Sequence, residues 1–165
     1  MYSADLWPGA TQRRAPVRLD PVTLVLALAT AGANFGVGLY GAVRWYRVEP
    51  TRRFWPALRV AQALAVAFAL YATVLAALGS GSEDGLFLLY AALPVAVNVV
   101  AEQLRIASAQ SVLDARGLAS AAALGDRPEE EQRSVVRQIL RRELGVMALA
   151  ALVVAFLALR AVGTG

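Results

Sequence analysis

The sequence predicts an all-α polytopic membrane protein in which four transmembrane helices form a bundle. Hydrophobic residues make up 58% of its 165 residues and charged residues only 17%. The mean hydropathy of +0.54 is also high for a water-soluble domain of this size. Four apolar segments each approach the roughly 20 residues that an α-helix needs to cross a bilayer. We therefore expect residues 21–165 to form one membrane domain, preceded by a polar tail at residues 1–20.

The first two apolar segments are the longest. The first, at about residues 22–43, contains no charge and follows Asp20 and Pro21, a pair typical of a helix start. The second, at about residues 55–78, ends in a glycine-rich turn. A cleavable signal peptide is the alternative for the first segment, but its 22 apolar residues exceed the roughly 7 to 15 of a signal-peptide core. We therefore predict that both segments span the membrane.

The third and fourth segments, at about residues 86–104 and 144–162, are a little short for a bilayer but can continue as helix beyond it. Pro94 should kink the third segment because it removes a backbone donor. Between the two, residues 125–131 combine a glycine that can stop a helix with a proline and three acidic residues that favour a new start. We therefore expect spans three and four to extend into the cytoplasm as a helical hairpin at about residues 105–143.

The second arm of this expected hairpin is amphipathic. Apolar residues such as Val135 and Ile139 recur at helical spacing, whereas Arg133, Arg137 and Arg141 follow one another at four-residue intervals on another face. Two arrangements satisfy this pattern. The arm can continue span four as one helix, which the absence of a helix break favours, or it can lie along the inner leaflet with its arginines on lipid headgroups.

Arginines near the span ends predict the orientation of the chain. The connection between spans one and two carries several of them, and the one between spans three and four carries seven more. The only charged residues in the turn between spans two and three are acidic, Glu83 and Asp84. Because positive loops stay in the cytoplasm, we expect both termini outside a bacterial inner (plasma) membrane. Three arginines of the expected outer tail oppose this orientation: Arg13, Arg14 and Arg18.

Small residues at helical spacing identify candidate packing faces, because lipid tails give apolar helices no hydrophobic reason to associate. Gly32 and Gly36 form a small-xxx-small pattern in the first span. Ala61, Ala65 and Ala69 form a similar pattern in the second. We interpret these residues as contacts within the bundle, with a homo-oligomer interface as the alternative.

Polar residues at the inner boundary form the main candidate site. Arg59 lies 20 residues before Gly79, and Glu102 lies 17 residues after Gly85, so the two should reach a similar depth on either side of a tight outer turn. A cluster is therefore predicted from Arg59, Gln62, Glu102 and Arg105. Our first interpretation is an ion pair that holds two helices together while the arginines reach toward headgroups. The alternative is a cytoplasm-facing anion or substrate site with Glu102 as its titratable group.

Two amides lie deeper in the expected spans, Asn34 in the first and Asn98 in the third. An interhelical hydrogen bond, worth about 1 kcal/mol, is the simpler explanation for each. An ion or solute pathway is the alternative, since Pro94 frees a backbone carbonyl close to Asn98.

The amino-acid inventory excludes much of known membrane chemistry. The chain has no Cys and no His, which removes thiol catalysis, imidazole metal ligation, His-ligated haem and His-assisted nucleophiles. We expect no metal, no cofactor and no catalytic residue. All 16 basic residues are Arg, and they adjoin apolar segments. The expected partners are therefore the lipid bilayer and its anionic headgroups, with a homo-oligomer or protein partner possible, and not nucleic acid.

Three stretches carry a resemblance to known sequences. They are Arg-Phe-Trp-Pro-Ala-Leu-Arg-Val-Ala-Gln at 53–62, Leu-Tyr-Ala-Ala-Leu-Pro at 89–94 and Ala-Glu-Gln-Leu-Arg at 101–105. They resemble segments of uncharacterised four-span integral membrane proteins of GC-rich, actinobacterial-type bacteria. The resemblance implies a four-span fold over most of residues 22–160 and implies no activity.

The polar inventory supports packing and interaction better than chemistry. We therefore expect a non-enzymatic membrane scaffold or accessory subunit that interacts through its cytoplasmic hairpin. The alternative is a small oligomeric channel or transporter whose path runs past Asn98 toward Arg59 and Glu102. A lipid-modifying enzyme is a third reading, for which Glu102 is the only candidate general base.

Overall fold

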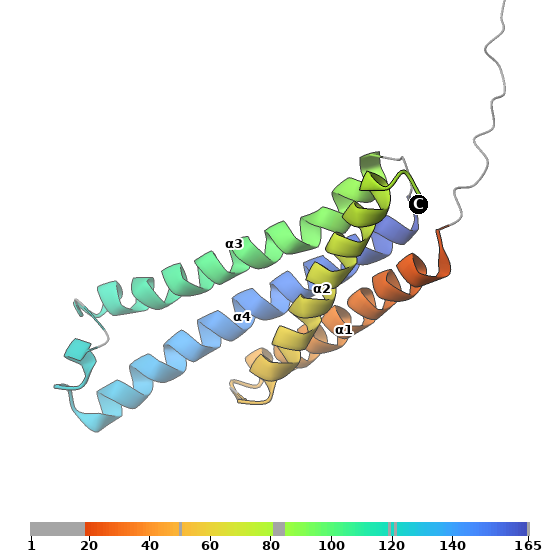
Figure 1. The fold of residues 1–165 in the computed structure, drawn as a ribbon. Coiled ribbons are helices and arrows are strands. Elements are labelled where there is room, and N and C mark those ends of the chain that lie inside the picture. The colour runs from red at the N-terminus through yellow and green to blue at the C-terminus, as the bar shows by residue number, and fades with distance from the viewer. Residues whose placement is uncertain (1–18, 50, 81–84, 119, 121, 165) are drawn as a thin grey trace, which may run out of the picture.

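The structure, a computed structural model, describes residues 19–49, 51–80, 85–118, 120 and 122–164. Its elements are α1 (Pro21–Tyr46), α2 (Phe54–Ala77), α3 (Gly85–Ala115), a 3-10 turn (Ala122–Leu124) and α4 (Glu129–Val162) (Figure 1). Each of the four α-helices is long and apolar enough to cross a membrane. The prediction of an all-α chain with four span-length helices is therefore confirmed. Several charges used to predict the orientation lie outside the described residues: Arg13, Arg14, Arg18, Glu83 and Asp84.

Local sequence explains where the helices begin. The carboxylate of Asp20 accepts the backbone N–H groups of Val22 and Thr23, both at 3.0 Å, and thereby caps α1. The Thr23 hydroxyl also donates to Asp20, and this bond lowers the pKa of the carboxylate from its ordinary 3.8. At α4, Pro128 precedes a first turn that contains Glu129 and two further acids, as the helix dipole favours.

The turn between α3 and α4 differs from the expectation. The third helix ends at Ala115, ten residues before the glycine at 125 that was expected to stop it. Gly117 adopts a φ of 65°, and the N–H of Leu118 donates to the carbonyl of Leu113 at 3.0 Å. This is a Schellman motif, which satisfies the last carbonyls of a helix and requires a residue that tolerates positive φ.

Helix α4 lies at the centre of the arrangement, with α1 and α3 packed along it on either side (Figure 1). Helix α2 crosses α1 and α3 and makes few contacts with α4. Two cores fill the four-helix part, one around Phe54 and Met147 and one around Phe68 and Phe87.

The packing of α1 on α4 corrects one prediction. Gly32 and Gly36 lie on an exposed face of α1, where a Cβ atom would meet nothing within 4 Å. Gly38 and Gly41 make the contact instead. A Cβ at Gly38 would lie 3.0 Å from the backbone nitrogen of Leu152, and one at Gly41 would lie 2.8 Å from the Cβ of Ala148. The prediction that Gly32 and Gly36 make contacts within the bundle was therefore wrong. The two glycine pairs lie on different faces of α1, and α4 packs on the face that carries Gly38 and Gly41.

The alanine stripe predicted for α2 is buried: Ala61 and Ala65 are inaccessible and Ala69 nearly so. Helix α4 contributes a matching series of buried small residues, at Ala148, Ala151, Ala155 and Ala158. Close backbone approach is what such residues permit.

The far end of the α3–α4 pair has a core of its own, the hairpin core. It consists of Val112, Leu113, Leu118, Leu124 and Val135, all buried. Two polar contacts join the helices there. Arg116 donates to Gln138 at 3.3 Å, and Arg142 donates to Ser111 at 2.9 Å.

The outer surface changes character along the molecule. Large exposed hydrophobic side chains are common on α1 and α2, on α3 as far as Ile106, and on α4 from Leu149 onward. Among the described residues between 107 and 148, Val136 is the single exposed large hydrophobic side chain. The α1–α2 loop lies beside α4 at Leu140, since Thr51 and Arg52 of the loop line a small pocket with that residue. From Glu129 to Leu140, α4 therefore runs about 16 Å past that loop, at roughly 1.5 Å per residue.

Candidate functional site: a polar cluster between α2, α3 and α4

The structure brings the four predicted cluster residues together around the carboxylate of Glu102. Arg59 of α2 donates from Nη1 to Glu102 Oε1 at 2.6 Å and to Gln62 Oε1 at 2.7 Å. Gln62 donates from Nε2 to the same carboxylate oxygen at 3.3 Å. Arg105, one turn further along α3, donates from Nε to Glu102 Oε2 at 3.0 Å. One carboxylate thus accepts from three side chains on two helices.

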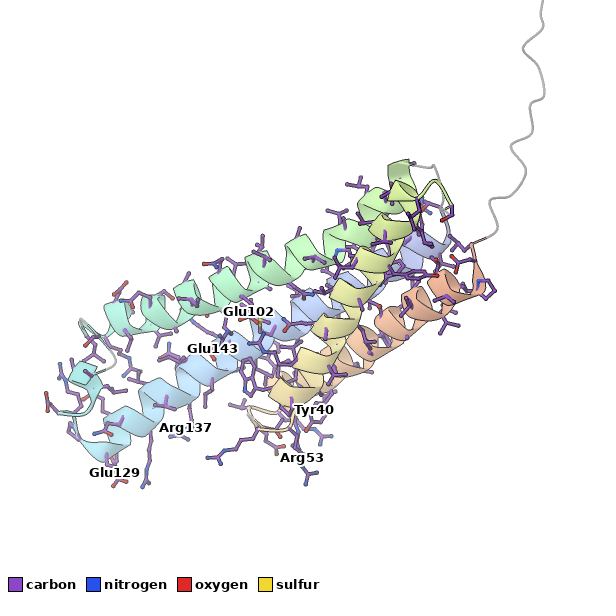
Figure 2. The ribbon with its side chains drawn as sticks, in the orientation of Figure 1. Tyr40, Arg53, Glu102, Glu129, Arg137 and Glu143 are labelled. Atoms are coloured by element: carbon purple, nitrogen blue, oxygen red, sulfur yellow. The ribbon has the colours of Figure 1, made fainter. Side chains whose placement is uncertain are left out.

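A fifth residue, which was not predicted from the sequence, joins the cluster from α4. Glu143 Oε2 lies 3.9 Å from Nη1 of Arg105, and its side chain is 15% exposed. Figure 2 shows Glu102 and Glu143 near one another, partway along the α3–α4 pair. The Arg105 guanidinium also lies 5.4 Å from the centre of the Trp55 ring. The cluster therefore links α2, α3 and α4.

Counting residues in both directions from the turn between α3 and α4 could have predicted that Glu143 lies near Arg105. Arg105 and Glu143 each lie 19 positions from Leu124, so a hairpin centred near that residue places them opposite each other. The signal was missed because Glu143 was assigned to the charged hairpin and not to the boundary of span four.

The charges of the cluster cancel. Two guanidinium groups face two carboxylates, and the structure gives each of the four an opposite charge within 4.0 Å. Glu102 is about one-quarter exposed and Arg59 about one-half, so the cluster reaches the surface on the α2 side. A neutral, mutually bonded set has no excess charge with which to hold an anion. Its ion pairs join three helices.

Asn34 is completely buried and connects α1 to α2. Its Nδ2 donates to the carbonyl of Thr30 at 2.9 Å and to that of Ala61 at 3.1 Å. The Thr30 hydroxyl donates to the carbonyl of Leu64 at 3.2 Å. A helix carbonyl has a second lone pair for such a bond. Two polar side chains of α1 therefore bond to consecutive turns of α2, and only Asn34 was predicted from the sequence.

Asn98 differs from Asn34 in the hydrogen bonding of its amide nitrogen. It is 9% exposed, and its Nδ2 has no hydrogen-bond partner among the described residues. The Oδ1 of Asn34 is likewise without one in the described part of the chain. The expected interhelical bond is therefore present at Asn34, while at Asn98 the structure shows no bond from the amide nitrogen.

Arginines collect at the end of α1 and along α4. Arg44 pairs with Glu49 and lies 5.6 Å from the Tyr40 ring, and Arg141 lies 5.5 Å from the ring of Trp45. Figure 2 shows Tyr40 and Arg53 at the α1–α2 turn and Arg137 further along α4. The described residues contain no group of three or more acidic side chains placed to hold a metal ion.

Comparison of the chain with family models, curated proteins and solved structures finds no match.

Proposed function

We propose that this protein is a non-enzymatic integral membrane scaffold or accessory subunit that binds another protein through the far end of its α3–α4 pair. In this proposal the four helices cross a bacterial inner membrane, with both termini outside. The α1–α2 loop and the far end of α3–α4 are then cytoplasmic. The arginines of that side would contact anionic headgroups.

The change in surface character carries the proposal. Exposed large hydrophobic side chains cover the part of the molecule that includes α1 and α2, and they stop near Ile106 and Leu149. Beyond that level the α3–α4 pair has a polar surface and a buried core that includes Val112 and Val135. A lipid-facing part and a water-facing part explain this change. The second part is a structured helical pair that offers a rigid surface for a partner.

The polar cluster supports a non-enzymatic role. Its two carboxylates are paired with arginines, and no nucleophile with an adjacent base accompanies them in the described structure. The charges hold α2, α3 and α4 together just where the apolar surface ends. That position gives the projecting helical pair a fixed orientation relative to the bundle.

Purification from the native membrane tests the proposal. The full chain would be isolated with a mild detergent, and co-purifying proteins would be identified and quantified by mass spectrometry. We expect one foreign protein to co-purify in stoichiometric amount. The variant Arg137→Glu reverses a charge on the projecting part of α4 and should lose this partner. Arg160→Glu, at the opposite end of α4, is the matched control and should retain the partner. A pure homo-oligomer would contradict the proposal.

A channel or transporter is the second candidate, and one observation favours it. The Nδ2 of Asn98 and the Oδ1 of Asn34 are buried polar atoms without partners among the described residues, as atoms lining a solute path can be. Liposome flux assays distinguish the two functions. In a transporter, Glu102→Gln and Arg59→Gln abolish flux and leave the folded yield intact. In a scaffold, both lower the yield and no flux exists to lose.

A further inference from the structure

A groove between α1 and α4 has the chemistry of a lipid site. It encloses about 540 Å³ and is lined mainly by apolar side chains, including Ala42, Leu149 and Leu152. Arg142 and Ser108 also line it. Arg142 lies about two turns of α4 before Leu149, at which the large exposed hydrophobic side chains begin. The groove is therefore apolar along its length and cationic at one end.

The groove exists because of a glycine and a tryptophan. A Cβ atom at Gly145 would lie 2.9 Å from Nε1 of Trp45, so the indole packs directly on the backbone of α4. Trp45 is 42% exposed and forms one wall of the groove. The Arg141 guanidinium lies 5.5 Å from its ring. A tryptophan with a neighbouring arginine is typical of the interface between acyl chains and headgroups.

Arg142 can bind an oxyanion at the end of the groove. In the described structure it makes one hydrogen bond, from Nη1 to Ser111 Oγ at 2.9 Å. A guanidinium has five N–H donors in a planar fork that matches the oxygens of a phosphate. No acidic side chain is among the residues that line the groove. Its charge is therefore complementary to an anion.

A second apolar groove runs along the other side of the same ridge. It encloses about 370 Å³ between α3 and α4, and its lining includes Val100, Leu104 and Val153. Val146 and Leu149 line both grooves. One ridge with a groove on each side can seat the two acyl chains of a single lipid, with one phosphate beside Arg142.

We propose that these two grooves bind one diacyl anionic phospholipid, with its phosphate on Arg142 and an acyl chain on each side of the Val146–Leu149 ridge. The site rests on the membrane location in the proposed function but not on the protein partner. A soluble anion would not need the apolar grooves, and a purely apolar ligand would not need Arg142.

Native mass spectrometry of the purified full chain tests this site. Phosphatidylglycerol and phosphatidylcholine with identical acyl chains would each be titrated into the detergent-solubilised protein. We expect one phosphatidylglycerol bound at least fivefold more tightly than phosphatidylcholine. Arg142→Gln should remove that preference, and Leu149→Trp, which fills both grooves from an exposed position, should weaken both lipids.

Two matched variants separate the site from simpler explanations. Arg137→Gln removes one charge from the same helix outside the groove and should leave the preference unchanged. Ser111→Ala removes the hydrogen bond of Arg142 without its charge and should also leave it unchanged. The site is wrong if Arg137→Gln and Arg142→Gln behave alike, or if the two lipids bind equally. It is also wrong if a second copy of the chain occupies the grooves, so that Leu149→Trp abolishes a dimer and leaves lipid binding unchanged. Release of the protein from membranes by alkaline carbonate without detergent would instead contradict the proposed function itself.

Discussion

Helix α4 packs in two different ways along its length. Next to α1 it buries alanines, and Gly38 and Gly41 of α1 let the two backbones approach closely. Next to the far end of α3 it buries Val135 against larger side chains such as Val112 and Leu113. The same helix thus buries mainly alanines in one half, together with the larger Met147 and Val154, and a branched residue in the other.

The membrane location that we propose explains the difference, because it exposes the two halves to two different solvents. In lipid, burying a large apolar side chain gains little because the lipid tails are equally apolar, and close packing of small residues holds helices together. In water, burial of apolar area gains about 25 cal/mol per Å², so larger side chains stabilise more. The outer surface changes at the same level as the core, with the last large exposed hydrophobic side chain of α3 at Ile106, and supports the same boundary.

The largest expected effect comes from the glycine contact of α1. Gly38→Val should destabilise the fold by about 3 kcal/mol, because even the first added atom would lie 3.0 Å from a backbone nitrogen of α4, which cannot move aside as a side chain can. Gly36→Val, on the same helix with nothing within 4 Å, is the control and should cost little. Unfolding by SDS in mixed micelles measures both. Equal losses would show that close approach is not what holds α1 to α4.

The hairpin core should give a smaller and more local effect. Val135→Ala removes two buried methyl groups and should cost about 2 kcal/mol. Because this core is separate from the other two, hydrogen exchange should rise within residues 108–140 and stay unchanged in α1. Val136→Ala, at a side chain that is 44% exposed, should change neither. Faster exchange throughout the chain after Val135→Ala would mean that the two halves unfold as one unit.

Some features of both halves follow from sequence alone, and others do not. The lengths of the apolar segments predicted the four helices, and counting along a tight turn placed Arg59 near Glu102, because both depend on a helix rise that hardly varies. The choice of Gly38 and Gly41 over Gly32 and Gly36 could not be predicted in this way. It depends on which face of α1 meets α4, whose contacting residues Ala148 and Leu152 lie more than a hundred positions further along the chain.

The start of α4 was evident from Pro128 and three acids, whereas the end of α3 was not. Gly117 was available as a stop, but the sequence from 102 to 123 contains no proline and would also suit a longer helix. The Schellman motif at Gly117 depends on the contact of Leu118 with the hairpin core, which is a property of the folded pair. The position of Glu143 beside Arg105 likewise follows from how the two arms align.

The cluster at the junction of the two halves should have an intermediate effect. Glu102→Gln leaves Arg59 and Arg105 without their shared carboxylate and should cost about 1.5 kcal/mol. In combination with Arg59→Gln the loss should be less than the sum of the two single losses, since both remove the same 2.6 Å contact. Glu130→Gln, at an exposed position in the first turn of α4, is the charge-matched control. Strictly additive losses in SDS titrations would exclude a coupled pair.

The smallest expected effect lies at the other end of the bundle, at the cap of α1. The pKa of Asp20 is lowered on folding by the hydroxyl of Thr23, so its contribution to stability is complete above the ordinary pKa of 3.8 and is lost as the pH falls through the lower folded value. Asp20→Ala should cost about 1 kcal/mol at neutral pH and progressively less below pH 3.8. Amide exchange of Val22 and Thr23, whose N–H groups the carboxylate accepts, measures the loss residue by residue. The described residues of the hairpin core include no titratable side chain. Val135→Ala should therefore lower the stability by the same amount at neutral pH and below pH 3.8. A cost of Asp20→Ala that does not change with pH would mean that side-chain packing, and not the charge of the carboxylate, holds the first turn of α1.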